Sequence, residues 1–173
     1  MPGTVAGVRT GDIIPEIAAD PNSENVYLVW QARAASGKAT IMFSRSTDGG
    51  RSWSTPTAIN ARRDVDAFTP AISVAPNGVV TVTYYDLRAA TAAAPLLTET
   101  RSIHSHDGGA TWGDDALVNG PFDQSTAAIA RGYFLGDYEA LGAEGAGGFQ
   151  SGRVEADGTA TTRNSDVFGN DTH

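Results

Sequence analysis

The stretch Ser46-Thr47-Asp48-Gly49-Gly50-Arg51-Ser52-Trp53 recurs as Ser105-His106-Asp107-Gly108-Gly109-Ala110-Thr111-Trp112. Both octets follow the pattern S-x-D-G-G-x-[ST]-W. An aspartate tolerates turn geometry and accepts hydrogen bonds from nearby amides, and the glycines reach positive φ cheaply. The tryptophan adds a large apolar ring that we expect to hold the turn against its own sheet. The pattern therefore predicts two equivalent structural turns, built on Ser46, Asp48, Gly50 and Trp53 and on Ser105, Asp107, Gly109 and Trp112.

The residues before each octet repeat as well. The matched pairs lie 55 residues apart and are Pro15/Pro70, Ile17/Ile72, Pro21/Pro76, Trp30/Tyr85 and Arg33/Arg88. The octets themselves lie 59 residues apart, so four extra residues are expected in the alanine-rich stretch after Arg88. A period of this size, with short strands and frequent turn signals, is typical of a β-sheet repeat.

These octets resemble the Asp-box, or BNR repeat, the signature turn of the sialidase-like β-propellers. The resemblance implies an all-β fold made of four-stranded antiparallel meanders, called blades. The expected blades span about 12–60, about 66–119 and, incompletely, about 133–173. Propellers close with about 4–8 blades, so residues 1–173 predict a partial ring. Three explanations stay open: a C-terminal piece of a larger six-bladed protein, which we favour, pairing with another copy, or an open assembly.

Alternating apolar and polar residues predict the individual strands. In the first repeat the expected strands are 13–18, 25–31, 40–46 and 57–60. In the second they are 71–74, 79–85, 99–105 and 116–119. A short helix is expected over 123–131 because Asp123 suits an N-cap. A strand over 136–141 is expected to start the third repeat, and 165–168 is expected to start its third strand.

Composition limits the function classes. The chain has 173 residues, a net charge of −8 and no cysteine. Its acidity disfavours nucleic-acid and anionic-membrane partners, and no thiolate metal site is available. We expect no cofactor and no metal. The N-terminus shows no charged-then-apolar signal sequence, which suggests a truncated start or an intracellular product, although proteins of the family are often secreted.

Strand order predicts where chemistry would sit. If the octets join the third and fourth strands, they lie at one end of the blades. The loops between strands two and three, and the connections between blades, then lie at the other end. That end should receive Arg33, Arg62, Arg63, Asp64, Asp66, Asp86, Arg88, Asp137 and Tyr138.

In sialidase-like enzymes this end carries the active site. There, arginines bind the substrate carboxylate in a bidentate manner, a tyrosine paired with a glutamate acts as nucleophile, and an aspartate is the acid/base. The resemblance therefore implies a glycan as substrate or ligand. It makes Arg33, Arg62 and Arg88 candidates for binding it. The candidates for catalysis are Asp86, Arg88, Asp137 and Tyr138.

The sequence departs from the family pattern at two points. The Arg-Ile-Pro motif of the family is replaced by Ile13-Ile14-Pro15 and by Phe68-Thr69-Pro70, so its arginine is missing. Tyr138 and Glu139 are neighbours, but alternation along a strand would point them to opposite faces. Two hypotheses remain: an exo-α-sialidase-like glycoside hydrolase that is inactive as this chain alone, or a non-catalytic propeller module that binds glycan or protein.

Overall fold

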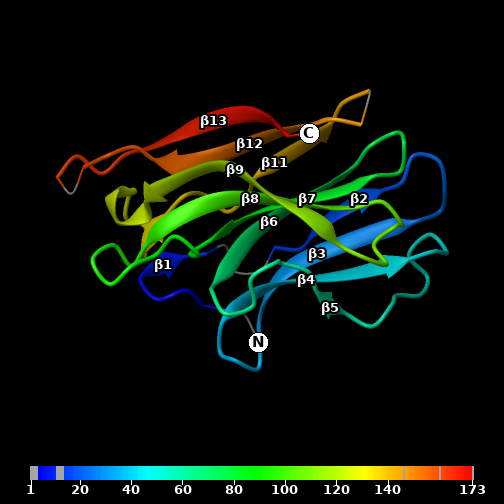
Figure 1. Cartoon of the computed structure of the whole chain (residues 1–173), viewed down its shortest axis with the longest axis horizontal. Coiled ribbons are helices and arrows are strands. Elements are labelled where there is room, and N and C mark those ends of the chain that lie inside the picture. The colour runs from blue at the N-terminus through cyan, green and yellow to red at the C-terminus, as the bar shows by residue number, and fades with distance from the viewer. Residues whose placement is uncertain (1–3, 11–13, 146, 160, 173) are drawn as a thin grey trace.

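The computed structural model describes residues 4–10, 14–145, 147–159 and 161–172. The expectations for Met1–Gly3, for Ile13 and for His173 lie outside these residues. The described chain is all-β, and its main sheets stack side by side in chain order (Figure 1). No helix of the described chain is long and apolar enough to cross a membrane.

Two four-stranded antiparallel meanders follow one another, as predicted. The first sheet contains β2 (Glu16–Ala19), β3 (Val26–Arg33), β4 (Ala39–Ser46) and β5 (Thr57–Ala58), in that order. The second contains β6 (Ala67–Val74), β7 (Val80–Asp86), β8 (Leu97–Ser105) and β9 (Gly113–Asp123). The octets occupy equivalent places, because each joins the third strand of its sheet to the fourth.

The third sheet has three strands among the described residues: β11 (Ala140–Ala143), β12 (Phe149–Ala156) and β13 (Ser165–Thr172). A separate parallel pair joins β1 (Val8–Arg9) to β10 (Tyr133–Phe134). The helix expected over 123–131 is wrong in extent, since only the 3₁₀ turn η1 (Gln124–Thr126) forms. Asp123 does cap this turn, accepting a hydrogen bond from the Ser125 amide at 2.9 Å.

Strand register corrects the repeat alignment. Ile17 pairs with Leu28 in the first sheet, and Ile72 pairs with Val82 in the second. Leu28 is therefore equivalent to Val82 at an offset of 54, so Trp30 corresponds to Tyr84 and not to Tyr85. The turn between the first two strands is one residue longer in the first sheet. The later insertion, between the second and third strands of the second sheet, is consequently five residues rather than four.

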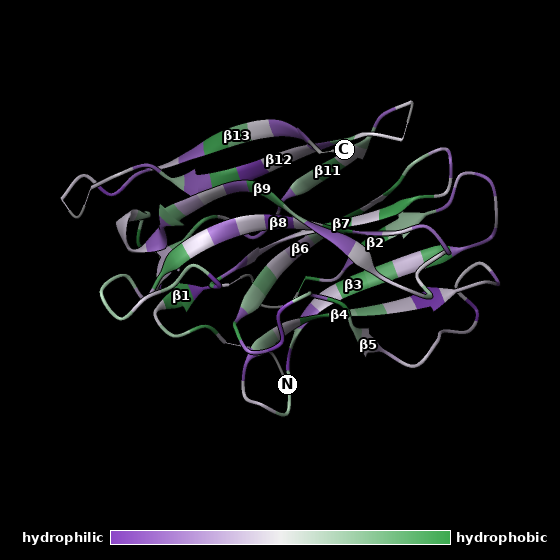
Figure 2. Cartoon of the chain, viewed as in Figure 1, coloured by the Kyte–Doolittle hydropathy of each residue, from purple (hydrophilic) through white to green (hydrophobic). Residues whose placement is uncertain are grey.

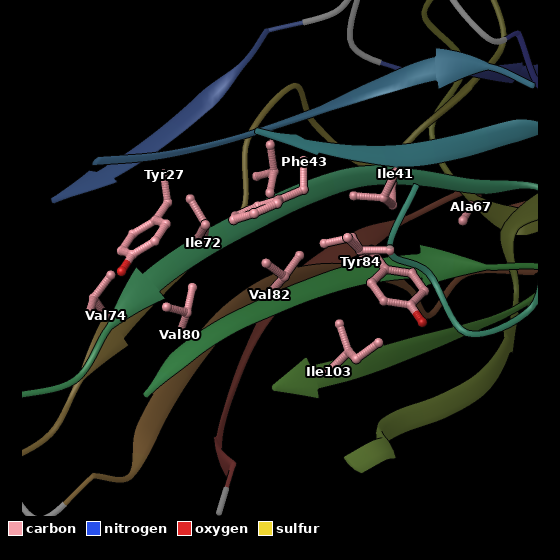
Figure 3. Close-up of a cluster of buried hydrophobic side chains, with 12 residues drawn as sticks. Tyr27, Ile41, Phe43, Ala67, Ile72, Val74, Val80, Val82, Tyr84 and Ile103 are labelled. Atoms are coloured by element: carbon pink, nitrogen blue, oxygen red, sulfur yellow. The ribbon is translucent and has the colours of Figure 1, made fainter. Parts of the chain in front are cut away.

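The main core lies between the first and second sheets. The first sheet contributes Tyr27, Val29, Ile41 and Phe43 from its side facing β6 and β7. The second sheet contributes Ile72, Val74, Val80, Val82, Tyr84 and Ile103 (Figure 3). Hydropathy alternates along the strands, with green and purple segments following one another on β3 and β4 (Figure 2). Two apolar sheet faces thus bury each other, as neighbouring blades do.

The two octets form nearly the same hydrogen-bonded turn. Ser46 Oγ donates to Asp48 at 2.7 Å and accepts from the Gly50 amide at 2.8 Å. Asp48 also accepts from the backbone and side chain of Ser52, at 2.8 and 2.6 Å. The second octet repeats all four contacts with Ser105, Asp107, Gly109 and Thr111. These hydrogen bonds, first among them those from Ser52, lower the pKa of Asp48 to about 2.

The tryptophans do more than hold their own turns, which corrects our expectation: Trp53 donates to the Gly50 carbonyl of its own octet at 3.1 Å, whereas Trp112 also reaches the neighbouring sheet. Trp112 packs edge-on against Phe43 of the preceding sheet, with ring centroids 5.0 Å apart. Arg45 of that sheet donates to the Gly108 carbonyl at 3.0 Å. Trp53 has no preceding sheet to contact among the described residues, and it is 40% exposed. The octet is therefore a connector between neighbouring blades.

We expect the two tryptophans to differ sharply on truncation. Trp112→Ala should lower the free energy of unfolding by about 2 kcal/mol, because it removes half-buried contacts at the junction between the sheets. Trp53→Ala should cost less than about 0.5 kcal/mol, in the range of ordinary surface substitutions. Urea unfolding of both variants would check this, and equal losses would contradict the connector role of the octet.

Candidate functional site

The structure separates the two ends of the sheets as the strand order predicted. At one end, the Gly49 amide of the first octet donates to the Glu24 carbonyl of the neighbouring turn at 3.1 Å. At the other end, Lys38 bonds Asp66 at 3.0 Å, and the Leu87 amide donates to the Asp66 carbonyl at 3.1 Å. The loop after β3, the connection to β6 and the loop after β7 therefore meet at the second end.

Arg88 sits in a network of carboxylates. Its guanidinium contacts Asp86 at 2.6 Å and Asp115 at 2.5 Å, and Arg101 binds the same Asp115 at 2.8 Å. Burial would lower the pKa of Arg88, but the hydrogen bonds that it donates to Asp86 and Asp115 raise that pKa above its ordinary value. The network thus keeps Arg88 charged and occupies the donors that would grip a substrate carboxylate. Asp115 and Arg101 were missed by sequence reasoning because they lie on other strands.

The other predicted binding arginines are placed differently. Arg62 forms a bidentate pair with Asp64, at 2.8 and 2.6 Å, and both side chains are largely exposed. Their hydrogen bonds lower the pKa of Asp64 to about 2. Arg63 donates to the Ala58 carbonyl at 2.5 Å. Arg33 ends β3 and is exposed. Arg62 and Arg88 are thus each paired with aspartates, and their role in binding a carboxylate stays a prediction.

Asp137 and Tyr138 lie beside a residue that sequence reasoning did not select. Arg9 pairs with Asp137 at 3.2 Å, and its guanidinium lies 4.0 Å over the Phe134 ring. Tyr138 is 64% exposed. The parallel pairing of β1 with β10 brings Arg9 next to Asp137. No local sequence pattern predicts a pairing between strands so far apart in the chain. This group offers an exposed phenol next to a carboxylate that is already paired.

An open cleft lies beside the Arg88 network, between the outer strands β5 and β9. Its volume is about 440 Å³, within the range of small-ligand sites. Polar and aromatic side chains line it, namely Asn60, Arg63, Trp112 and Asp115. A planar indole, a guanidinium and a carboxylate around one opening can bind polar ring compounds or peptide side chains.

A tyrosine and a glutamate do meet in the structure, but in its interior. Tyr85 of β7 and Glu139, just before β11, come close to each other between the second and third sheets, where the Thr83 hydroxyl donates to Glu139 at 3.4 Å. Tyr85 also donates to the Val154 carbonyl at 2.5 Å, and it is 1% exposed. Burial raises the pKa of Glu139 to about 8. Sequence reasoning missed this pair because its members belong to different blades.

The histidines beside the second octet make separate contacts. His104 Nδ1 lies 2.8 Å from the Thr81 hydroxyl, and burial lowers the pKa of His104. His106 contacts Asp114 at 3.1 Å on the surface. Within the part of the chain that the structure describes, no group of three or more His, Cys, Asp or Glu side chains could hold a metal ion.

Comparison with known proteins supports the fold. No family model matches the chain, and no curated protein matches its sequence. It is similar to the Hadza microbial sialidase Hz136, with 17% identity, a TM-score of 0.55, and coverage of 91% of this chain and 34% of that one. It is also similar to a protein of unknown function from Dyadobacter fermentans, with 14% identity, a TM-score of 0.58, and coverage of 95% and 53%.

The chain therefore spans about a third and about half of these two neighbours. At such identities the likeness shows a fold, and it agrees with the repeated geometry of the two octets. The fold is sialidase-like, in the form of successive antiparallel sheets. The likeness does not carry an activity to this chain.

Proposed function

We propose that this chain is a non-catalytic binding module with a sialidase-like propeller fold. The proposal rests on one observation: the residues that catalysis would need are absent, already paired or buried. The arginine of the Arg-Ile-Pro motif is absent, and Arg88 is held by Asp86 and Asp115. The Tyr85–Glu139 pair is sealed between two sheets.

The cleft between β5 and β9 is the best supported ligand site for such a module. Arg63 offers donors and Asp115 offers acceptors for hydroxyl groups, and Trp112 offers an aromatic edge. Sugars combine hydroxyl groups with apolar ring faces, so this lining suits a glycan. The same lining suits a short peptide of a protein partner, which is the other form of the binding hypothesis.

The competing proposal is an exo-α-sialidase-like glycoside hydrolase. The solved sialidase among the structural neighbours favours it, as does the exposed Tyr138 beside Asp137. Hydrolysis would require a nucleophile and an acid in precise positions. A displacement of about 1 Å can reduce the rate of the catalysed reaction about 10²-fold. Asp137 is moreover already paired with Arg9, at 3.2 Å.

We expect the purified chain to show no turnover of a fluorogenic sialoside above the buffer rate between pH 5 and pH 8. The assay should run beside an active sialidase and beside the Arg88→Ala and Tyr138→Phe variants. Hydrolysis by the wild-type chain that disappears in both variants would refute the non-catalytic proposal. It would place the active site at the end that carries Arg88 and Tyr138.

A further inference from the structure

The outer face of the first sheet repeats a surface that is buried elsewhere in the chain. In the second sheet, Ile72, Val82 and Tyr84 pack against the preceding sheet. Register places Ile17, Leu28 and Trp30 at the equivalent positions of the first sheet. Ile17 is 61% exposed, and Leu28 and Trp30 are half-buried. Trp53 extends this face, which we call the leading face, and the described residues do not cover it.

The outer face of the third sheet differs from the leading face, because glycine and polar residues form much of it. Ser151 and Arg153 of β12 are buried against the second sheet. Alternation therefore points their neighbours away from it. This trailing face is formed by Gln150 and Gly152 of β12 and by Val167, Gly169 and Asp171 of β13, whereas Val154 packs against a buried apolar cluster of the same chain. The trailing face is built around two paired glycines, so it leaves room for large side chains such as Trp30 and Leu28.

Charge also matches the two faces. At the existing junction, Arg45, near the end of β4, reaches the octet of the next sheet. Asp171 lies near the end of β13, at the same end of the molecule. The first octet, which would be the next one in a continued stack, carries the exposed Arg51. An Asp171–Arg51 contact would thus take the place of the Arg45–Gly108 contact.

We propose that two copies of this chain assemble head to tail, with the leading face of each against the trailing face of the other. Two such junctions, related by a two-fold axis, close a ring of six sheets. The closed arrangement covers both end faces of both copies, whereas a contact that does not close would build filaments. The inference concerns assembly and does not depend on the proposed function.

The first test is the mass in solution by light scattering after gel filtration. We expect twice the 18.0 kDa of one chain. Ile17→Glu on the leading face and Val167→Glu on the trailing face should each raise the dissociation constant at least tenfold. Both side chains are exposed, at 61% and 76%, so neither change should unfold the sheet. The control is Leu117→Glu, which is 50% exposed on the outer strand of the middle sheet and should leave the dimer intact.

The alternatives give different results, and each would overturn the proposal. A wild-type monomer at 100 μM, or masses that keep growing with concentration, would exclude a closed dimer. Sensitivity to Ile17→Glu but not to Val167→Glu would indicate two leading faces in contact.

Cross-linking gives a second, independent measurement, because the chain contains no cysteine. Oxidation of the double variant Arg51→Cys, Asp171→Cys should yield a covalent dimer. Arg51→Cys alone should stay uncrosslinked, because the two octets of a head-to-tail ring lie apart. Failure of the double variant to cross-link, or cross-linking of the single variant, would contradict the arrangement.

Discussion

The Gly109→Ala variant should lose on the order of 3–5 kcal/mol of unfolding free energy, which is most of the stability of many domains of this size. A methyl group at Gly109 would lie 2.3 Å from Phe43 Cζ and 2.6 Å from Cε1. The Phe43 ring cannot yield easily, because Tyr27 stacks on it and Trp112 meets it edge-on. The change would therefore push the second sheet off the first. Urea denaturation followed by tryptophan fluorescence would measure the loss.

Gly50→Ala is the matched control. Gly50 holds the same place in the first octet and has a φ of +90°, against +84° for Gly109. A Cβ there would approach nothing closer than 3.9 Å, at Trp53. The backbone strain of about 1–2 kcal/mol should therefore be its whole cost. If the two substitutions destabilise the protein equally, positive φ and not the contact between sheets would explain both glycines.

The sequence predicted the repeat because its signals are local. The octets carry their own hydrogen-bonding groups from Ser46 to Ser52, so their geometry needs nothing from distant residues. The strands followed from alternation. The register did not, because a one-residue difference in the turn before β3 leaves no mark on the pattern of Leu28 and Trp30. The sequence also did not predict the role of Trp53 and Trp112, because that role depends on which sheet lies next to each octet.

The candidate site was harder to predict than the fold. The end of the sheets that carries Arg88 and Asp137 follows from strand order alone. The partners of these residues do not, because Asp115 and Arg9 reach them through contacts between distant strands. In the structure Arg62 pairs with Asp64, and Arg88 pairs with Asp86 and Asp115. Whether any of these residues binds a ligand stays a prediction for the assays above.

The stability of the protein should fall as pH rises from 6 to 9, and Glu139 should cause most of the fall. In the unfolded chain this carboxyl has its ordinary pKa near 4.5, whereas burial raises its pKa to about 8 in the folded protein. The folded state therefore keeps a proton that the unfolded state has lost. The stabilisation is complete below about pH 4.5 and is lost as pH passes 8; its full size is on the order of 4–5 kcal/mol.

The groups around Glu139 should not produce the same slope. Thr83 does not titrate in this range, the pKa of Tyr85 is raised well above 10, and burial lowers the pKa of His104 from its ordinary value. Glu139→Gln keeps the shape of the side chain without its charge. Its stability should change little between pH 6 and pH 9, and at pH 9 it should exceed that of the wild type by several kcal/mol.

This titration also tests the argument against catalysis. A glutamate that paired with Tyr85 in a site open to substrate would be hydrated, and its ionisation would cost the folded state little. Equal pH profiles of unfolding for the wild type and Glu139→Gln would show that water reaches the pair. The strongest structural reason for placing this chain among binding modules would then be lost. A steep wild-type slope, removed by the substitution, would keep the pair in the dry interior, where no glycan can reach it.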